Sequence, residues 1–253
     1  MPLITSQIPE QWDDLEALVA AILNEAGLQA QRDVSLPLPR GSVKIDVLAD
    51  ETQDGIVQRI LCECKNWNTN VPKGIVHAFR TVVQEAGANR GYIISKIGFQ
   101  AGAIEAAQST NIELTTFADF QSLYFSKWYN KQLWDTENEL GAFNTYYEPF
   151  GKPGYSRLEA DAERAAYDRV WNKYLFAGMM LELYSPYNRL VKSINSDPVG
   201  YPSLPLDVSR LEEHGIETPA DIGTAVAYRE FFTILTRIYA NWVTRTASGQ
   251  PDH

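Results

Sequence analysis

The sequence contains few cysteines and histidines, and this shortage excludes several kinds of site. Only two of its 253 residues are cysteines and three are histidines. Cys62 and Cys64 are separated by one residue on an expected strand, where their Cα atoms would lie about 7 Å apart, too far for an easy disulfide. A zinc site would need more ligands than these residues offer. We therefore expect two reduced core cysteines in a cytoplasmic protein.

Long apolar runs are also lacking. No stretch of 18 apolar residues occurs in the sequence, although a membrane-spanning helix would need at least about that length. No positively charged and then apolar leader opens the chain. We therefore expect a protein that is neither exported nor bound in a membrane.

Basic residues are outnumbered in this chain. There are 22 lysines and arginines against 32 aspartates and glutamates, which gives a formal net charge of −10. A chain with this charge repels nucleic acid as a whole, so binding would need a local basic surface, metal ions or basic segments of an oligomer. The 45% hydrophobic content is that of a folded protein, and 253 residues allow two modest domains or one large one.

The most informative stretch of the sequence is residues 42–65. It reads S-V-K-I-D-V-L-A, then D-E-T-Q-D-G, then I-V-Q-R-I-L-C-E-C-K. This pattern predicts two strands joined by a polar six-residue turn, with alternation over residues 43–49 and a second strand rich in β-branched and apolar residues. Because successive side chains point to opposite faces, Glu63 and Lys65 should share one face and the two cysteines the other. Asp46, on the partner strand, can face Glu63.

Two carboxylates and one ammonium group would thus gather at the ends of paired strands, beside strongly apolar neighbours. Such groups are costly to bury unless a partner compensates them. Magnesium is such a partner, because it takes oxygen ligands from one or two carboxylates and keeps its other positions for water and phosphate. The hairpin therefore indicates a magnesium site.

Asp46 precedes Glu63-Cys64-Lys65 by 17 residues. This arrangement resembles the D…E-x-K signature of the PD-(D/E)XK nuclease superfamily, and its surroundings over roughly residues 8–122 are similar to those of Mrr-like restriction endonucleases. Those surroundings are a first helix with W-D-D-L-E, the hairpin, a helix after Trp67, the strand G-Y-I-I-S, G-F and an alanine-rich helix. Two features depart from the pattern: Ile45 replaces the proline of the superfamily name, and the lead into Asp46 is not rich in glycine.

The resemblance implies an α/β restriction-endonuclease-like core, in which a mixed sheet is flanked by helices. It implies that Asp46 and Glu63 hold one or two Mg²⁺ ions, or Mn²⁺, with the carbonyl of Cys64 as a further ligand. Glu16 would bind a second metal ion or its water. Lys65 would orient the attacking water and stabilise the developing negative charge.

Mrr-like nucleases belong to restriction and phage-defence systems. The resemblance therefore implies DNA as the substrate and a homodimer or larger homo-oligomer that presents two sites. Three functions remain open: a magnesium-dependent endodeoxyribonuclease, a nuclease that resembles Holliday-junction resolvases, and a non-catalytic sensor of a ligand or partner on a nuclease scaffold. RNA is also compatible with the metal chemistry.

Several polar residues near the hairpin are candidates for contacts with a phosphate backbone. They are Arg40 and Lys44 beside the first strand, and Lys73, His77, Arg80 and Gln84 on one side of a helix expected from residue 72 to residue 85. For each of them taken alone we expect an ordinary solvated surface residue, whereas for Glu16 a solvated helix face and a place near the metal explain the sequence equally well. Trp67 could stack on a base, but we expect it in the core beneath that helix.

The expected elements of the first half alternate in type. They are a helix over residues 9–26, a strand over 28–34, a proline-containing loop over 36–41, the hairpin, the helix over 72–85, a strand over 92–95, a helix over 100–108, a strand over 112–114 and a helix opening at 115–119. This order predicts a mixed sheet flanked by helices, whose last strands are parallel.

Residues 123–253 are expected to form a separate, mainly helical and aromatic-rich domain for oligomerisation, regulation or partner binding, after a nuclease domain over residues 1–122. Helices are predicted over residues 156–184, 186–194 and 218–246. Ser156 and Glu159 would form a capping box at the start of the first. No helix-turn-helix, zinc-finger or repeat pattern occurs in this half.

Overall fold

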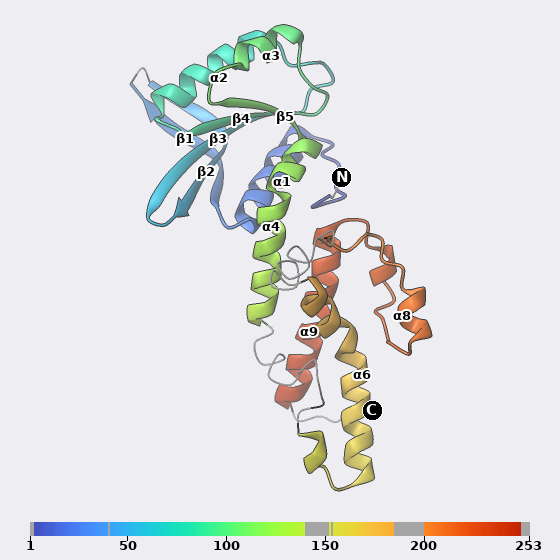
Figure 1. The fold of residues 1–253 in the computed structure, drawn as a ribbon. Coiled ribbons are helices and arrows are strands. Elements are labelled where there is room, and N and C mark those ends of the chain that lie inside the picture. The colour runs from blue at the N-terminus through green and yellow to red at the C-terminus, as the bar shows by residue number, and fades with distance from the viewer. Residues whose placement is uncertain (1–2, 40, 140–151, 153, 185–199, 249–253) are drawn as a thin grey trace. The chain divides into compact units, whose positions relative to one another are not determined.

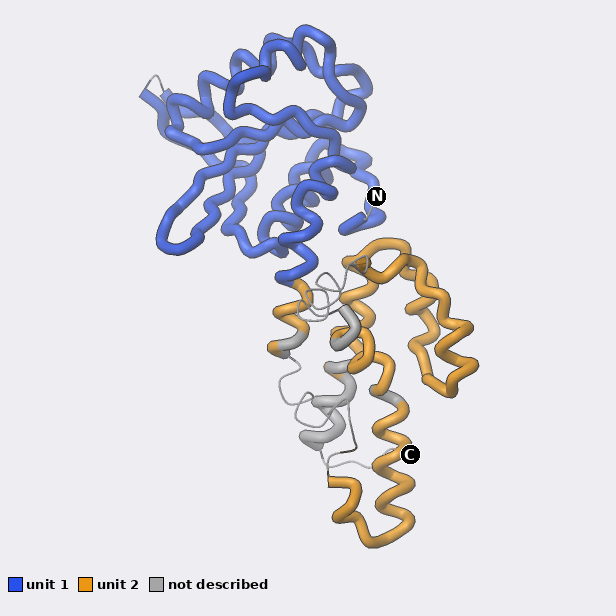
Figure 2. Tube along the Cα trace, in the orientation of Figure 1, with its two compact units in different colours: residues 1–131 blue, residues 132–253 orange. Residues whose placement is uncertain are grey.

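A computed structural model gives the fold of the chain (Figure 1). It describes residues 3–39, 41–139, 152, 154–184 and 200–248. The chain divides into two compact units, residues 1–131 and 132–253 (Figure 2). The boundary expected after residue 122 falls inside helix α4 (Phe117–Glu139), which is continuous there.

The first unit contains the elements in the order that the sequence predicts. They are α1 (Trp12–Glu25), β1 (Gln29–Leu38), β2 (Gly41–Gln53), β3 (Ile56–Lys65), α2 (Lys73–Glu85), β4 (Arg90–Ser95), α3 (Ala101–Ala107), β5 (Ile112–Thr116) and the start of α4. The strands form one sheet in the order β1-β2-β3-β4-β5. The β1–β2 and β2–β3 pairs are antiparallel, and the β3–β4 and β4–β5 pairs are parallel.

Helices cover both faces of this sheet (Figure 1). Helices α2 and α3 lie on one side, and α1 and the beginning of α4 lie on the other. The predicted restriction-endonuclease-like core, a mixed sheet flanked by helices, is therefore confirmed.

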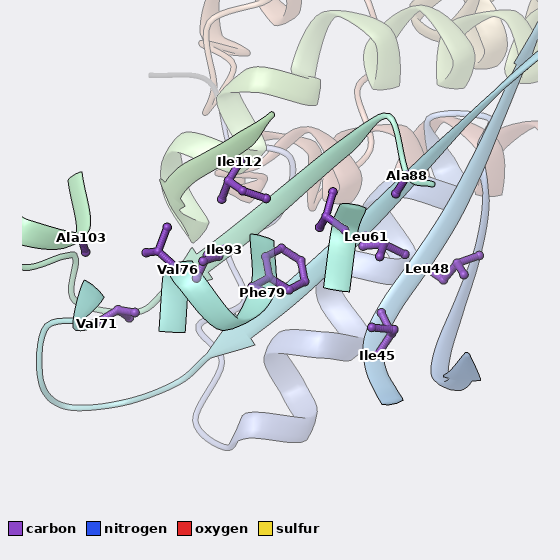
Figure 3. Packing of buried hydrophobic residues seen from close by; sticks show 11 residues of the cluster. Ile45, Leu48, Leu61, Val71, Val76, Phe79, Ala88, Ile93, Ala103 and Ile112 are labelled. Carbon is purple, nitrogen blue, oxygen red and sulfur yellow. The ribbon is translucent and has the colours of Figure 1, made fainter. Parts of the chain in front are cut away.

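The core beneath α2 is aliphatic apart from Phe79 (Figure 3). Helix α2 buries Val76, Phe79 and Val83, whose spacings of three and four residues place them on one helical face. Gly91 of β4 lets the helix approach the sheet closely, since a Cβ atom there would lie 2.7 Å from Val83 Cγ2 and 2.9 Å from Phe79 Cε1. Any larger residue at this position would push α2 away from the sheet.

Aromatic side chains hold α4 against the opposite face. The ring of Tyr92 on β4 meets Phe120 and Tyr124 edge-on, with centroids 5.7 and 6.1 Å apart. Trp128 Nε1 donates to Glu25 Oε2 of α1 at 2.6 Å. The first part of the aromatic-rich segment thus belongs to the core of the first unit.

The hairpin and β1 differ from the prediction in two respects. Only Asp54 and Gly55 separate β2 from β3, and both have positive φ angles, 51° and 80°, as in the tight turns that suit twisted hairpins. Pro37, expected to break the first strand, lies inside β1 opposite Ser42. Because β1 is an edge strand, the missing N–H of proline can face away from the sheet at little cost.

The second unit is mainly helical, as predicted. Its described elements are η1 (Tyr155–Arg157), α6 (Asp161–Tyr184), α8 (Ser209–Glu213), η2 (Ile222–Thr224) and α9 (Tyr228–Ser248). Helices α6 and α9 are in contact. None of the helices in the described ranges is both long and apolar enough to span a membrane.

Both long helices of this unit begin later than predicted. The capping box at Ser156 is wrong, because Ser156 lies in η1 and the N–H of Ala160 instead donates to Glu163 Oε2 at 3.4 Å. Helix α9 starts after Ala227, where Glu230 Oε2 accepts the N–H groups of Val226 and Ala227 at 3.0 and 3.3 Å. The helix expected over residues 186–194 lies outside the described residues.

Candidate active site

Asp46 lies on β2 where the pairing with β3 ends. The last pair of the register is Val47 opposite Cys62, and one further step places Asp46 opposite Glu63. The Asp46 carboxylate turns toward β3, where its Oδ2 accepts the N–H of Cys64 at 2.7 Å. This hydrogen bond holds the carboxylate beside the backbone that joins Glu63 to Lys65.

Strand β2 is irregular around Asp46. Ile45 and Leu48 are three residues apart, so strict alternation would place them on opposite faces, yet both belong to the cluster beneath α2 (Figure 3). On β1, Asp33 has a φ angle of 55°, and pairing with β2 is regular on either side of it. The predicted alternation over residues 43–49 is therefore wrong, and the irregularity falls at the candidate metal ligand.

Glu63 and Lys65 form an ion pair at the end of β3, as expected for residues that share a face. Their side chains are 22% and 14% exposed, so both are largely removed from water. Burial raises the pKa of Glu63, the Lys65 ammonium lowers it, and the charge of Asp46 raises it again. The Lys65 ammonium therefore offsets part of the cost of burying the charged Glu63 carboxylate, and the pKa of Glu63 stays above its usual value.

Glu16 is buried in α1, with 3% of its surface exposed. Its Oε2 accepts no hydrogen bond from the described residues, and Arg32 Nη2 of β1 lies 3.9 Å away. Burial raises the pKa of Glu16 to about 7, and the charges of Asp46 and Asp33 act in the same direction. Solvation of Glu16 on a helix surface is therefore excluded.

The donor set suits a hard cation. Within the part of the chain that the structure describes, no group of three His, Cys, Asp or Glu side chains is arranged as a complete metal site. Magnesium does not need such a group, because one or two carboxylates suffice and water completes its shell. Glu16 Oε2 is buried without a hydrogen-bond partner among the described residues, and the charge of Asp46 raises the pKa of Glu16 and Glu63. A bound cation would offset both of these costs.

The cysteine side chains do not contribute to such a site. Cys62 and Cys64 are free and buried, as predicted. Burial raises the pKa of both thiols well above the usual range, and Mg²⁺ prefers oxygen ligands to sulfur. Cys64 could therefore offer a metal ion only its backbone carbonyl.

The predicted phosphate-binding residues occupy different places. Lys44 pairs with Asp33 at 2.7 Å, which raises the pKa of Lys44, and the charges of Glu16 and Asp46 add to this effect. Lys44 is therefore within electrostatic reach of the site. The α2 candidates are exposed to solvent; they are Lys73, His77, Arg80 and Gln84. Arg40 lies outside the described residues.

Two residues at the site were missed or misplaced by the sequence interpretation. Arg32 forms an ion pair with Asp13 and lies beside Glu16, and its signal in the sequence is a basic residue in the stretch Q-A-Q-R-D that opens this edge strand. Trp67, expected in the core, is 40% exposed, and Lys65 Nζ lies 5.6 Å from its ring centroid. The space beneath α2 is filled by other side chains, which leaves Trp67 on the surface.

Comparison with known proteins gives one family match. Residues 9–124 match the family model Mrr_cat, described as a restriction endonuclease. No curated protein matches the sequence significantly.

Three solved structures resemble part of the chain. The protein of unknown function AF1548 is 19% identical and covers 51% of this chain and 78% of its own, with a TM-score of 0.38. The DNA modification-dependent restriction endonuclease AspBHI is 17% identical and covers 50% and 39%, with a TM-score of 0.31. MspJI restriction endonuclease, in complex with a 27-mer oligonucleotide, is 14% identical and covers 46% and 27%, with a TM-score of 0.30. The likeness thus spans less than half of the length of either endonuclease.

Proposed function

We propose that the protein is a metal-dependent endonuclease that hydrolyses DNA phosphodiester bonds, because residues 9–124 match the Mrr_cat restriction endonuclease model. One observation carries this proposal: the hydrogen bond from the Cys64 N–H to Asp46 brings a carboxylate from β2 to the Glu63–Lys65 pair of β3. The four candidate residues, which include Glu16, all lie within the matched stretch. We further propose a role in restriction or phage defence.

The carboxylates would provide the metal site. Asp46 and Glu63 would hold one or two Mg²⁺ or Mn²⁺ ions, together with the carbonyl of Cys64, and Glu16 would bind a second ion or its water. When bound, the cation would lower the pKa of a coordinated water and neutralise charge on the phosphate oxygens. The hydrogen bond from the Cys64 N–H would hold the Asp46 carboxylate in one orientation before the substrate arrives.

Lys65 would act on the attacking water and on the phosphate. Its ammonium group is held by Glu63 and is largely shielded from solvent. In such an environment a fixed positive charge stabilises developing negative charge more strongly than it would in water. Lys65 would therefore orient the attacking water and stabilise the transition state.

We propose a homodimer or larger homo-oligomer as the active form, because such an assembly presents two sites and could act on two strands. Residues 132–253 are the candidate for oligomerisation, regulation or binding of a partner. They contain 11 basic and 17 acidic residues, a balance that does not favour contact with a phosphate backbone.

A cleavage assay with purified protein tests the proposal. Supercoiled plasmid, linear duplex, single-stranded DNA, four-way junctions and RNA would each be incubated with Mg²⁺, with Mn²⁺ and with EDTA. The expected result is cleavage of DNA with either metal and none in EDTA, with cleavage lost in Lys65→Ala.

The same assay separates the rival functions. Preference for four-way junctions over linear duplex would indicate a junction resolvase, and cleavage of RNA alone would exclude DNA as the substrate. Lack of cleavage under every condition would favour a non-catalytic sensor and would contradict the proposal.

A further inference from the structure

Trp67 is a large aromatic side chain on the surface next to the candidate catalytic lysine. It lies two residues after Lys65, and the ammonium group of Lys65 is 5.6 Å from the centroid of its ring. With 40% of its surface exposed, the side chain is partly open to solvent. An exposed tryptophan at this position is not needed to fill the core.

The loop that carries Trp67 is tied to two different elements. The side chain of Asn66 donates to the carbonyl of Glu10 at 3.1 Å, just before α1. The side chain of Asn68 accepts from Lys96 Nζ at 3.3 Å, just after β4. Since the residues on both sides of Trp67 are held, the backbone that carries the ring is restrained, which reduces the entropy lost when a ligand binds to it.

The electrostatic attraction of this unit for a phosphate backbone is weak. Residues 1–131 contain 11 basic and 15 acidic residues. Six of the basic side chains form ion pairs with carboxylates, and these are Arg32, Lys44, Arg59, Lys65, Arg90 and Lys127. Because duplex DNA is captured mainly through its phosphates, the unit needs another source of affinity. Stacking of a base on an aromatic ring is such a source and does not depend on charge.

On these grounds, we propose that Trp67 is a stacking platform for an unpaired nucleobase beside the scissile phosphate. The site would then favour DNA with unpaired nucleotides, such as single strands, flaps or bubbles, over continuous duplex. In a duplex both faces of each base are covered by neighbouring bases, so only an unpaired base can offer its face to Trp67. This inference rests on the proposed nuclease function and adds the substrate class.

Binding measured without cleavage tests the inference. Fluorescence anisotropy in EDTA would compare a labelled single strand with the duplex of the same sequence, for the wild type, Trp67→Ala, Trp67→Phe and Trp134→Ala. Trp134 is the matched control, because it is also an exposed tryptophan, at 60%, and lies outside the first unit. Thermal melting of each variant would verify folding.

The expected result is selective. Trp67→Ala should weaken single-strand binding about tenfold and change duplex binding less than about twofold, since a stacked base contributes on this scale. Trp67→Phe, which keeps a flat ring, should recover most of the affinity, and Trp134→Ala should bind as the wild type does.

Other outcomes overturn the inference. An equal loss on both substrates would mean that Trp67 only supports Lys65 or the loop, and no loss would mean that it does not contact DNA. If the wild type cuts DNA while Trp67→Ala keeps single-strand affinity, the stacking role falls and the nuclease function stands. If the wild type neither binds nor cuts DNA, both fall.

Discussion

Glu16 occupies an environment that disfavours its charge while no cation is bound. Its side chain is buried in α1 next to Arg32, and burial together with the charges of Asp46 and Asp33 raises its pKa from 4.5 to about 7. Since the folded protein holds this proton more tightly than the unfolded chain does, its contribution to stability is fully present only at low pH. That contribution is lost as the pH rises from about 4.5 to about 7.

This leads to a prediction for Glu16→Gln. In EDTA at pH 8, the variant should be more stable than the wild type by about 1–3 kcal/mol, because it removes an uncompensated buried charge. The difference should disappear near pH 4, where Glu16 is protonated in both states. Urea unfolding at a series of pH values measures this.

A control variant, Glu105→Gln, and the addition of Mg²⁺ extend this unfolding experiment. Glu105→Gln, at an exposed position on α3, should leave the unfolding free energy unchanged at every pH. Addition of Mg²⁺ should stabilise the wild type more than Glu16→Gln. If the unfolding free energies of the wild type and Glu16→Gln differ by the same amount at every pH, Glu16 does not carry an uncompensated buried charge.

At the level of single residues, the sequence predicted which side chains gather at the candidate site better than it predicted how buried each of them is. The hairpin pattern predicted that Asp46 can face Glu63, and the observed register, continued one step beyond the Val47–Cys62 pair, places them opposite each other. The burial of Glu16 was not predictable, since it borders the apolar stripe of its helix and only tertiary packing decides its exposure. The outward position of Trp67 was not predictable, because the space beneath α2 is filled by side chains from several elements, which no local pattern reveals.

Among the elements, the contact between α2 and β4 determines how closely the helix covers the sheet. A Cβ atom at Gly91 would lie within 3 Å of Val83, Ile112 and Phe79 side chains. We therefore predict that Gly91→Ala destabilises the protein by about 1–3 kcal/mol, which is the usual cost of overpacking a core. Chemical denaturation measures this change.

Gly74 of helix α2 gives a matched control for Gly91→Ala. A Cβ atom there would meet nothing within 4 Å, so Gly74→Ala should stabilise the protein by about 0.5–1 kcal/mol through helix propensity alone. Equal stability of Gly91→Ala and the wild type would mean that α2 does not pack on the sheet as described.

Elements with a strong local pattern were predicted well, and their ends were not. The helix over residues 72–85 is correct because its apolar spacing matches the buried face of α2. Pro37 misled the prediction, since its effect depends on whether the strand lies at the edge of the sheet. The start of α9 is set by the Glu230 carboxylate, a capping contact that competes with the earlier Thr218-Pro219 signal.

At the scale of the whole molecule, the acidic balance limits how DNA can be bound. The net charge is −10, and acidic residues outnumber basic ones in both units. Few counterions would therefore be released from DNA on binding. We predict that log Kd changes with log salt concentration with a slope of only about 1 to 3 in magnitude, whereas proteins with extensive phosphate contacts approach about 10.

Titration of labelled DNA at several salt concentrations, with EDTA present to prevent cleavage, measures this slope. Lys73→Ala and Arg80→Ala on the exposed side of α2 should each reduce its magnitude by about 1 if these residues contact phosphates. A steep slope in the wild type would contradict the picture of a weakly electrostatic interface.

The central claim is that Asp46, held by the backbone of Cys64, joins Glu63, Glu16 and Lys65 in a metal-dependent hydrolytic site. Its most direct test is the single-turnover rate of DNA cleavage in Mg²⁺ by the wild type and by Asp46→Asn, with both proteins shown to be equally folded by thermal melting. We expect Asp46→Asn to cut at least about a hundredfold more slowly than the wild type. Cleavage by Asp46→Asn at the wild-type rate would contradict it.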